Sequence, residues 1–156
     1  TTHALTYLHS LCPVVIHRDL KSRNILLTVF GISRERVDHT MTAGVGTSLW
    51  IAPEVLMGER YDDKADIFSF GVVLSELDLQ VLPYTHAIES DGSGHRMRDL
   101  AVLQRMVMGK LRVQFSPGAL ASMVALGYAC VSLNTKKRPT AAEVLYRLQM
   151  IQRDGL

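Results

Sequence analysis

The sequence has 156 residues, a length that supports one domain with a substantial buried core. Hydrophobic residues make up 47 % and charged residues 21 %, which excludes an intrinsically disordered chain. The formal net charge is +2 and the basic residues are scattered, so the composition does not favour nucleic-acid binding, although a basic patch at residues 136–138 stays open as an alternative.

Cysteine usage and hydropathy exclude two further classes. Cys12 and Cys130 are too few for a disulfide framework and too far apart for a CxxC metal site, so both are predicted to be reduced core thiols. The longest mostly apolar stretch, residues 119–133, is too short to cross a bilayer and predicts a buried helix. No signal peptide is indicated, and residue 1 is Thr, so we expect the sequence to begin inside a longer protein or to follow processing.

The first third of the chain predicts one helix and a long loop. Leu5 and Leu8 lie three residues apart within residues 2–11, which is typical of a short amphipathic helix, and Pro13 ends it. Residues 14–16 and 25–27 are short β-like runs. Residues 31–46 are polar and contain several glycines, which predicts a loop of a length that is uncommon unless it is functional.

The rest of the chain predicts helices. Residues 63–79 are apolar on nearly every helical face, which indicates a central core helix with one stripe formed by Ile67, Phe70, Leu74 and Leu77. Further helices are expected over residues 100–108 and 117–131, with a polar surface insertion at 89–98. Thr140 and Glu143 form a capping box that opens the last helix. The fold class is therefore mainly α.

Five short motifs follow one another in a fixed order. The first is His-Arg-Asp-Leu at residues 17–20, followed by Asn24, which matches H-R-D-L-x-x-x-N at every fixed position. The others are Phe-Gly at 30–31 where D-F-G is expected, Ala-Pro-Glu at 52–54, Asp-Ile-Phe-Ser-Phe-Gly from Asp66, and Arg-Pro-Thr from Arg138. Taken singly, these residues could be surface ion pairs and turn residues. As an ordered set they are not expected by chance.

The ordered set resembles the C-terminal lobe of a eukaryotic protein kinase, and it is most similar to the tyrosine-kinase-like group of Ser/Thr kinases. The resemblance covers essentially all 156 residues and implies a partial kinase domain at 1–156, with the activation segment at about 30–54. It implies a fold that is mainly helical here and α+β when complete. The complete domain would transfer the γ-phosphoryl group of Mg-ATP to protein Ser or Thr, by default in the cytoplasm.

The resemblance assigns chemical roles to four residues. Asp19 would accept the proton of the attacking substrate hydroxyl, because a carboxylate within hydrogen-bond reach can take it. Lys21 would contact ATP and neutralise charge on the transferred group. Asn24 would offer an amide oxygen to Mg²⁺, which prefers oxygen ligands. Leu26 would line the cofactor site together with Lys21 and Asn24.

It also assigns supporting roles. His17 and Phe30 would stack in the core, and Asp66 would hold the backbone of the catalytic loop. Glu54 and Arg138 would form a buried ion pair, against the alternative of an exposed pair.

Three threonines belong to the expected activation segment. Thr40 and Thr42 lie where phosphorylation sites of the family occur, and Arg18 could pair with such a phosphate. Thr47 is expected to touch the catalytic loop instead. The alternative for Thr40 and Thr42 is that they are ordinary loop residues.

The sequence also departs from the family pattern. No Gly-rich loop, V-A-I-K lysine or helix-C glutamate occurs among these residues, so the N-terminal lobe is expected to be missing. Val29 stands where the metal-binding Asp of D-F-G belongs, and only residues 25–28 separate it from Asn24. A β-hairpin of roughly eight residues does not fit there. The alternatives are therefore an inactive fragment of a Ser/Thr kinase, a pseudokinase-like scaffold that binds proteins, and a gene-model remnant.

Overall fold

The computed structural model describes residues 1–25, 45–87 and 97–154. Within these ranges it contains six α-helices, three short 3₁₀-helices and no β-strand, which confirms a mainly α fold. The α-helices are α1 (Thr2–Ser10), α2 (Pro53–Leu56), α3 (Lys64–Leu79), α4 (Asp99–Val107), α5 (Ala121–Cys130) and α6 (Ala141–Asp154). The 3₁₀-helices are η1 (Ser22–Asn24), η2 (Val45–Trp50) and η3 (Thr135–Lys137).

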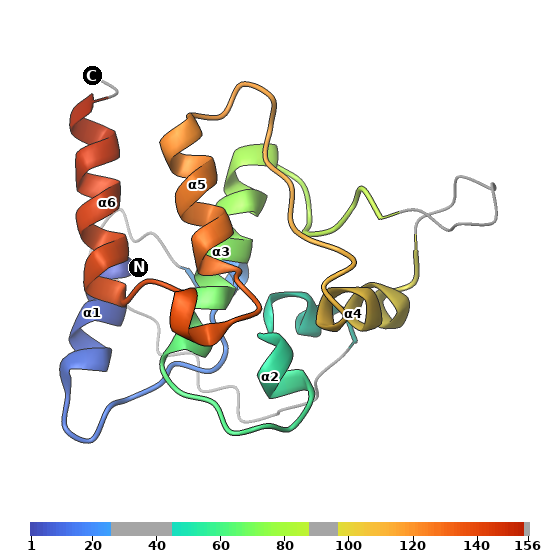
Figure 1. Ribbon diagram of the computed structural model, residues 1–156, viewed down its shortest axis with the longest axis horizontal. Coiled ribbons are helices and arrows are strands. Elements are labelled where there is room, and N and C mark those ends of the chain that lie inside the picture. The colour runs from blue at the N-terminus through green and yellow to red at the C-terminus, as the bar shows by residue number, and fades with distance from the viewer. Residues whose placement is uncertain (26–44, 88–96, 155–156) are drawn as a thin grey trace.

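Helix α3 is the centre of the structure (Figure 1). All of its residues from 65 to 75 are buried, because apolar side chains occupy nearly every face of the helix. One face packs with η2 and α4, and the other packs with α1, α5 and α6. The predicted stripe is wrong at Leu77, which is 57 % exposed because the C-terminal end of the helix extends beyond the core.

Helices α1, α5 and α6 lie on one side of this centre. Figure 1 shows α1 beside the first turns of α6, and α5 between α6 and α3. Close approach of α3 to α5 requires a glycine at position 71, since a Cβ there would lie 2.7 Å from the Cβ of Cys130. Burial raises the pKa of the Cys130 thiol to about 12, so this cysteine is an unreactive core residue.

The termini of the helices follow local sequence signals. The Thr140 hydroxyl accepts a hydrogen bond from the Glu143 amide at 3.2 Å, and the Glu143 carboxylate accepts one from the Thr140 amide at 2.7 Å. The predicted capping box at the start of α6 is therefore confirmed. Pro53 occupies the first turn of α2, where its missing N–H costs no hydrogen bond.

Several expectations from the sequence are wrong. Residues 14–16 form no strand; Val14 and Val15 are exposed, and the Val15 amide donates to the Leu8 carbonyl at the end of α1. The predicted helix within 119–133 is present as α5, but it begins at Ala121 and ends at Cys130, and only Leu126, Gly127 and Cys130 are buried, so the prediction of a buried helix holds for one face only. Cys12 is exposed rather than part of the core.

Other expectations fall wholly or mostly outside the described residues, namely the loop at 31–46, the insertion at 89–98 and most of the run at 25–27. None of the described helices has the length and apolar character that a membrane-spanning helix requires.

Candidate active site

A buried carboxylate anchors the loop that carries the H-R-D-L motif. Asp66, in the first turn of α3, is 1 % exposed and accepts hydrogen bonds from the backbone amides of His17 (2.7 Å) and Arg18 (2.9 Å). Arg18 has φ = 67°, a left-handed conformation that is costly for a residue with a side chain. Because one carboxylate fixes two successive amides, it holds the loop in this strained shape.

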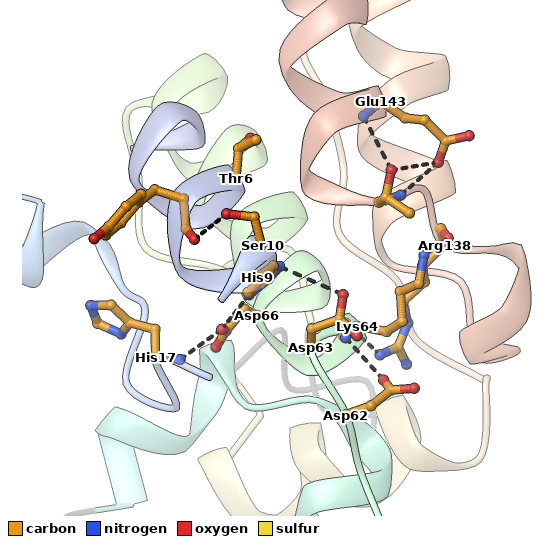
Figure 2. A network of polar contacts seen from close by, with 12 residues as sticks. Thr6, His9, Ser10, His17, Asp62, Asp63, Lys64, Asp66, Arg138 and Glu143 are labelled. Atoms are coloured by element: carbon orange, nitrogen blue, oxygen red, sulfur yellow. Dashed lines mark hydrogen bonds and ion pairs between the residues drawn. The ribbon is translucent and has the colours of Figure 1, made fainter. Parts of the chain in front are cut away.

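His9 in the last turn of α1 also contacts this carboxylate. Its Nε2 lies 2.9 Å from Asp66 Oδ2, and its Nδ1 lies 3.6 Å from Asp63 Oδ2 (Figure 2). The His9 side chain is only 7 % exposed. Sequence reasoning missed this residue, although its spacing from the buried Leu5 places both on one face of α1.

Asp19, Lys21 and Asn24 lie together on the solvent side of the same loop. Lys21 Nζ is 3.0 Å from Asp19 Oδ1, and Asn24 Nδ2 donates to Asp19 Oδ2 and to the Asp19 backbone carbonyl, both at 2.7 Å. The 3₁₀-turn η1 brings Asn24 back toward Asp19, since the Asn24 amide donates to the Lys21 carbonyl at 2.9 Å. Between Asp19 and Lys21, Leu20 is buried and fixes the loop to the core.

This cluster has the chemistry of a proton-accepting site. The Asp19 side chain is 58 % exposed, so a substrate hydroxyl can reach it. Lys21, whose side chain is 17 % exposed, places a positive charge beside it. The amide oxygen of Asn24 accepts no hydrogen bond from the described residues.

The donor set found among the described residues falls short of what Mg²⁺ requires. The cation requires near-octahedral oxygen ligands and is usually held by one or two carboxylates plus phosphates. The described residues contain no group of three or more His, Cys, Asp or Glu side chains that could hold a metal, and beside Asp19 only the neutral Asn24 oxygen is unengaged.

A second charged pair lies in the core, next to the first residue of α3. Arg138 Nη1 and Nη2 donate to the two Glu54 carboxylate oxygens at 2.6 and 2.8 Å, and the residues are 2 % and 5 % exposed. The Arg138 guanidinium also donates to the backbone carbonyls of Ser132 (2.7 Å) and Lys64 (3.0 Å). The pair therefore joins α2, α3 and the segment before α6. Because Arg138 is buried, it cannot contribute to a basic surface patch.

For the remaining predicted site residues, the structure describes only some of the expected contacts. His17 is an exposed residue whose backbone amide is held by Asp66. Its expected stacking partner Phe30 lies outside the described residues, so the stacking stays a prediction. The Arg18 guanidinium lies 6.0 Å from the centre of the Tyr61 ring. Thr47 lies within η2, where the structure describes its backbone but not its side chain. Also outside the described residues are Leu26, Val29, Thr40 and Thr42.

Comparison with known proteins identifies the family of the chain. The family model described as "Protein kinase domain" matches residues 1–148. The chain belongs to the protein kinase domain family. Among its relatives are the dual specificity protein kinase shkD of Dictyostelium discoideum, 33 % identical, and the probable serine/threonine-protein kinase drkC of the same organism, 34 % identical.

A plant relative shows similar likeness. The probable serine/threonine-protein kinase SIS8 of Arabidopsis thaliana is 31 % identical over 96 % of this chain and 14 % of its own length. The alignments with shkD and drkC cover 94 % and 93 % of this chain but 20 % of each relative. The chain therefore spans about a fifth of the length of these two curated kinases.

Proposed function

We propose that these 156 residues are the C-terminal-lobe part of a Ser/Thr kinase domain of the tyrosine-kinase-like group, whose complete form transfers the γ-phosphoryl group of Mg-ATP to protein Ser or Thr. The observation that carries the proposal is the exposed Asp19 carboxylate, held beside Lys21 and Asn24 on a loop that buried Asp66 anchors. The names of drkC and SIS8 support Ser/Thr specificity, whereas shkD is named a dual specificity kinase.

Each residue of the proposed site has a defined task. Asp19 accepts the proton of the attacking hydroxyl, and Lys21 neutralises charge on the transferred group. Asn24 and Leu26 contribute to nucleotide binding. In a complete domain that has the metal-binding Asp, Asn24 would help to hold Mg²⁺, which would supply charge neutralisation at the phosphates.

The proposal also includes regulation of the activation segment. When Thr40 or Thr42 is phosphorylated, Arg18 would form an ion pair with the phosphate group. Mass spectrometry of the native protein that finds phosphate only outside residues 31–46 would refute this part of the proposal.

We further propose that the chain, as its sequence stands, does not catalyse the reaction by itself. Val29 replaces the carboxylate that would complete the metal site, and the short link at residues 25–28 leaves no room for the hairpin. Positioning and electrostatic clamping of the phosphates supply most of the rate in this chemistry. The second candidate function, a scaffold that binds proteins, is favoured by the same replacement, because the helical frame is built without that carboxylate.

A phosphoryl-transfer assay tests the proposal. The purified chain, incubated with radiolabelled Mg-ATP and a generic Ser/Thr protein substrate, is expected to give no label above background. Turnover that disappears in Asp19→Ala but persists in the surface control Glu59→Ala would overturn the proposed inactivity. Sequencing the transcript across residues 28–29 and upstream of residue 1 distinguishes the alternatives: a longer transcript with a Gly-rich loop and D-F-G supports the enzyme, and a confirmed short link supports the scaffold or the remnant.

A further inference from the structure

Glu76, near the C-terminal end of α3, contacts two segments that are distant in the sequence. Its Oε1 accepts a hydrogen bond from the Ser22 hydroxyl at 2.8 Å, and its Oε2 accepts one from Trp50 Nε1 at 3.0 Å. Ser22 opens η1, the turn that ends at Asn24. Trp50 closes η2, directly before the segment that leads into α2.

Because these groups are buried or half-buried, water cannot readily replace either hydrogen bond. Trp50 is 4 % exposed and packs in the core cluster, so its indole N–H needs an acceptor within the protein. Ser22 and Glu76 are both half-buried, which limits how far water can replace their hydrogen bond. A carboxylate oxygen is a stronger acceptor than a neutral one. Because each oxygen serves one segment, Glu76 cannot move toward one partner without weakening its bond to the other.

A neighbouring carboxylate on the same helix behaves differently. Both oxygens of Asp78 accept from one residue, the amide and hydroxyl of Ser116, at 2.5 and 3.1 Å. Asp78 thus fixes a single position of the chain. Glu76 instead joins two loops to one rigid helix and to each other.

We propose that Glu76 is a positioning residue that couples η1, and through it Asn24 and Asp19, to η2. A displacement of either loop shifts the position of the Glu76 carboxylate. Because the other loop donates a hydrogen bond to the same carboxylate, the shift is transmitted to that loop. The coupling itself follows from the hydrogen bonds; its meaning, that the segment leading into Ala52-Pro53-Glu54 controls the geometry of the catalytic loop, rests on the proposed function.

The chain carries its own reporter for this coupling, since Trp50 is its single tryptophan. Ser22→Ala removes one hydroxyl from η1 and leaves η2 unchanged in sequence. We expect it to shift the Trp50 emission maximum and to increase quenching by acrylamide. We also expect it to lower hydrogen-exchange protection across residues 45–51 by about fivefold, the factor that one lost hydrogen bond is worth.

A double-mutant cycle separates coupling from general destabilisation. In a Glu76→Ala background, Ser22→Ala should cause no further change in Trp50 emission, because the shared acceptor is gone. Should far-UV circular dichroism show that Glu76→Ala is unfolded, Glu76→Gln replaces it; the amide keeps one acceptor and loses the second. The Ser22→Ala effect should then be smaller than in the wild-type chain.

The matched control is Ser10→Ala, which removes an exposed hydroxyl that donates to the Tyr7 carbonyl in α1. It should leave Trp50 emission unchanged. The proposal is overturned if Ser22→Ala leaves the emission of the folded chain unchanged, or changes it equally with and without Glu76. These spectra are independent of phosphoryl transfer, so failure of the coupling and failure of the proposed kinase activity are distinguished.

Discussion

The structure contains two pairs of a carboxylate and a cation, and they differ in exposure. In the first, the Arg138 side chain is 0 % exposed and engages both oxygens of Glu54. In the second, Asp19 is paired with Lys21 at a similar distance, but its side chain is 58 % exposed. Water screens the second pair and is excluded from the first. The same pairing of carboxylate and cation therefore stabilises the fold in one place and remains available for chemistry in the other.

Asp66 supports the exposed region from within the core. It is as buried as the Arg138–Glu54 pair, yet besides its contact with His9 it accepts two hydrogen bonds from the backbone of the exposed loop. The loop can thus present an exposed Asp19 while its backbone keeps one shape. This division predicts that substitutions in the buried region lower stability strongly and that substitutions at Asp19 do not.

The largest effect is expected for Arg138→Ala. Removing the guanidinium leaves the Glu54 carboxylate buried without its partner, so the free energy of unfolding should fall by about 3–5 kcal/mol in a denaturant titration. Lys137→Ala, at the exposed neighbouring position, serves as the control and should change little. A loss below about 1 kcal/mol for Arg138→Ala would mean that the pair is exposed or unformed in solution.

A smaller loss is expected for Asp66→Asn. The amide keeps one acceptor oxygen but places an N–H₂ group against a backbone donor, so one buried amide loses its partner. Such a loss costs about 1–3 kcal/mol. Asp62→Asn is the matched control, because Asp62 is exposed and accepts from the Lys64 amide through Oδ1, which Asn retains. Equal stability of the two variants would contradict the anchoring role.

The cap of α6 should contribute less still, and its contribution should depend on pH. Thr140→Ala is expected to lower stability by about 1 kcal/mol. Hydrogen bonds from the Thr140 amide and hydroxyl lower the pKa of the Glu143 carboxyl below its ordinary value of 4.5. Because the folded-state pKa is lowered, the stabilisation is present above pH 4.5 and is lost as the pH falls through the folded-state pKa.

The difference in unfolding temperature between the wild-type chain and Glu143→Ala should therefore become smaller as the pH falls below 4.5. Thermal unfolding at a series of pH values measures it. A difference that stays constant into strong acid would show that the carboxylate is not involved in the cap.

The smallest effect on stability is expected for Asp19→Ala. Its ion pair with Lys21 is largely exposed, so the free energy of unfolding should change by no more than about 0.5 kcal/mol. The same denaturant titration measures it. A loss of about 2 kcal/mol or more would place Asp19 with the structural residues and remove the contrast between the two regions.

The sequence predicted the features that depend on local pattern. Continuous apolar character predicts the burial of α3, and Thr140 with Glu143 predicts the start of α6. The family motifs implied the Glu54–Arg138 pair and the contacts of Asp66 with the catalytic loop, and the structure contains both sets of contacts. Local patterns and motifs do not specify how far each element extends into solvent. For this reason the predicted burial of Leu77 and the predicted strand at residues 14–16 are wrong.

Contacts between side chains of distant elements were also missed. His9 and Glu76 have unremarkable neighbours in the sequence, and their partners lie 57 and 54 residues away, at Asp66 and Ser22. No periodicity or short motif encodes such a distance. Only the packing of α1, η1 and η2 around α3 brings these groups together.

The most direct test of the central claim compares two matched completed proteins. Both carry a full N-terminal kinase lobe before residue 1; one keeps Val29 and the short link, and the other has a hairpin-length insertion after residue 27 together with Val29→Asp. The measurement is radiolabel transfer from Mg-ATP to a Ser/Thr protein substrate. Because Val29 stands where the metal-binding Asp of D-F-G belongs, we predict transfer only from the repaired protein, and its loss on Asp19→Ala. Normal activity of the protein that keeps Val29 and the short link would contradict the account.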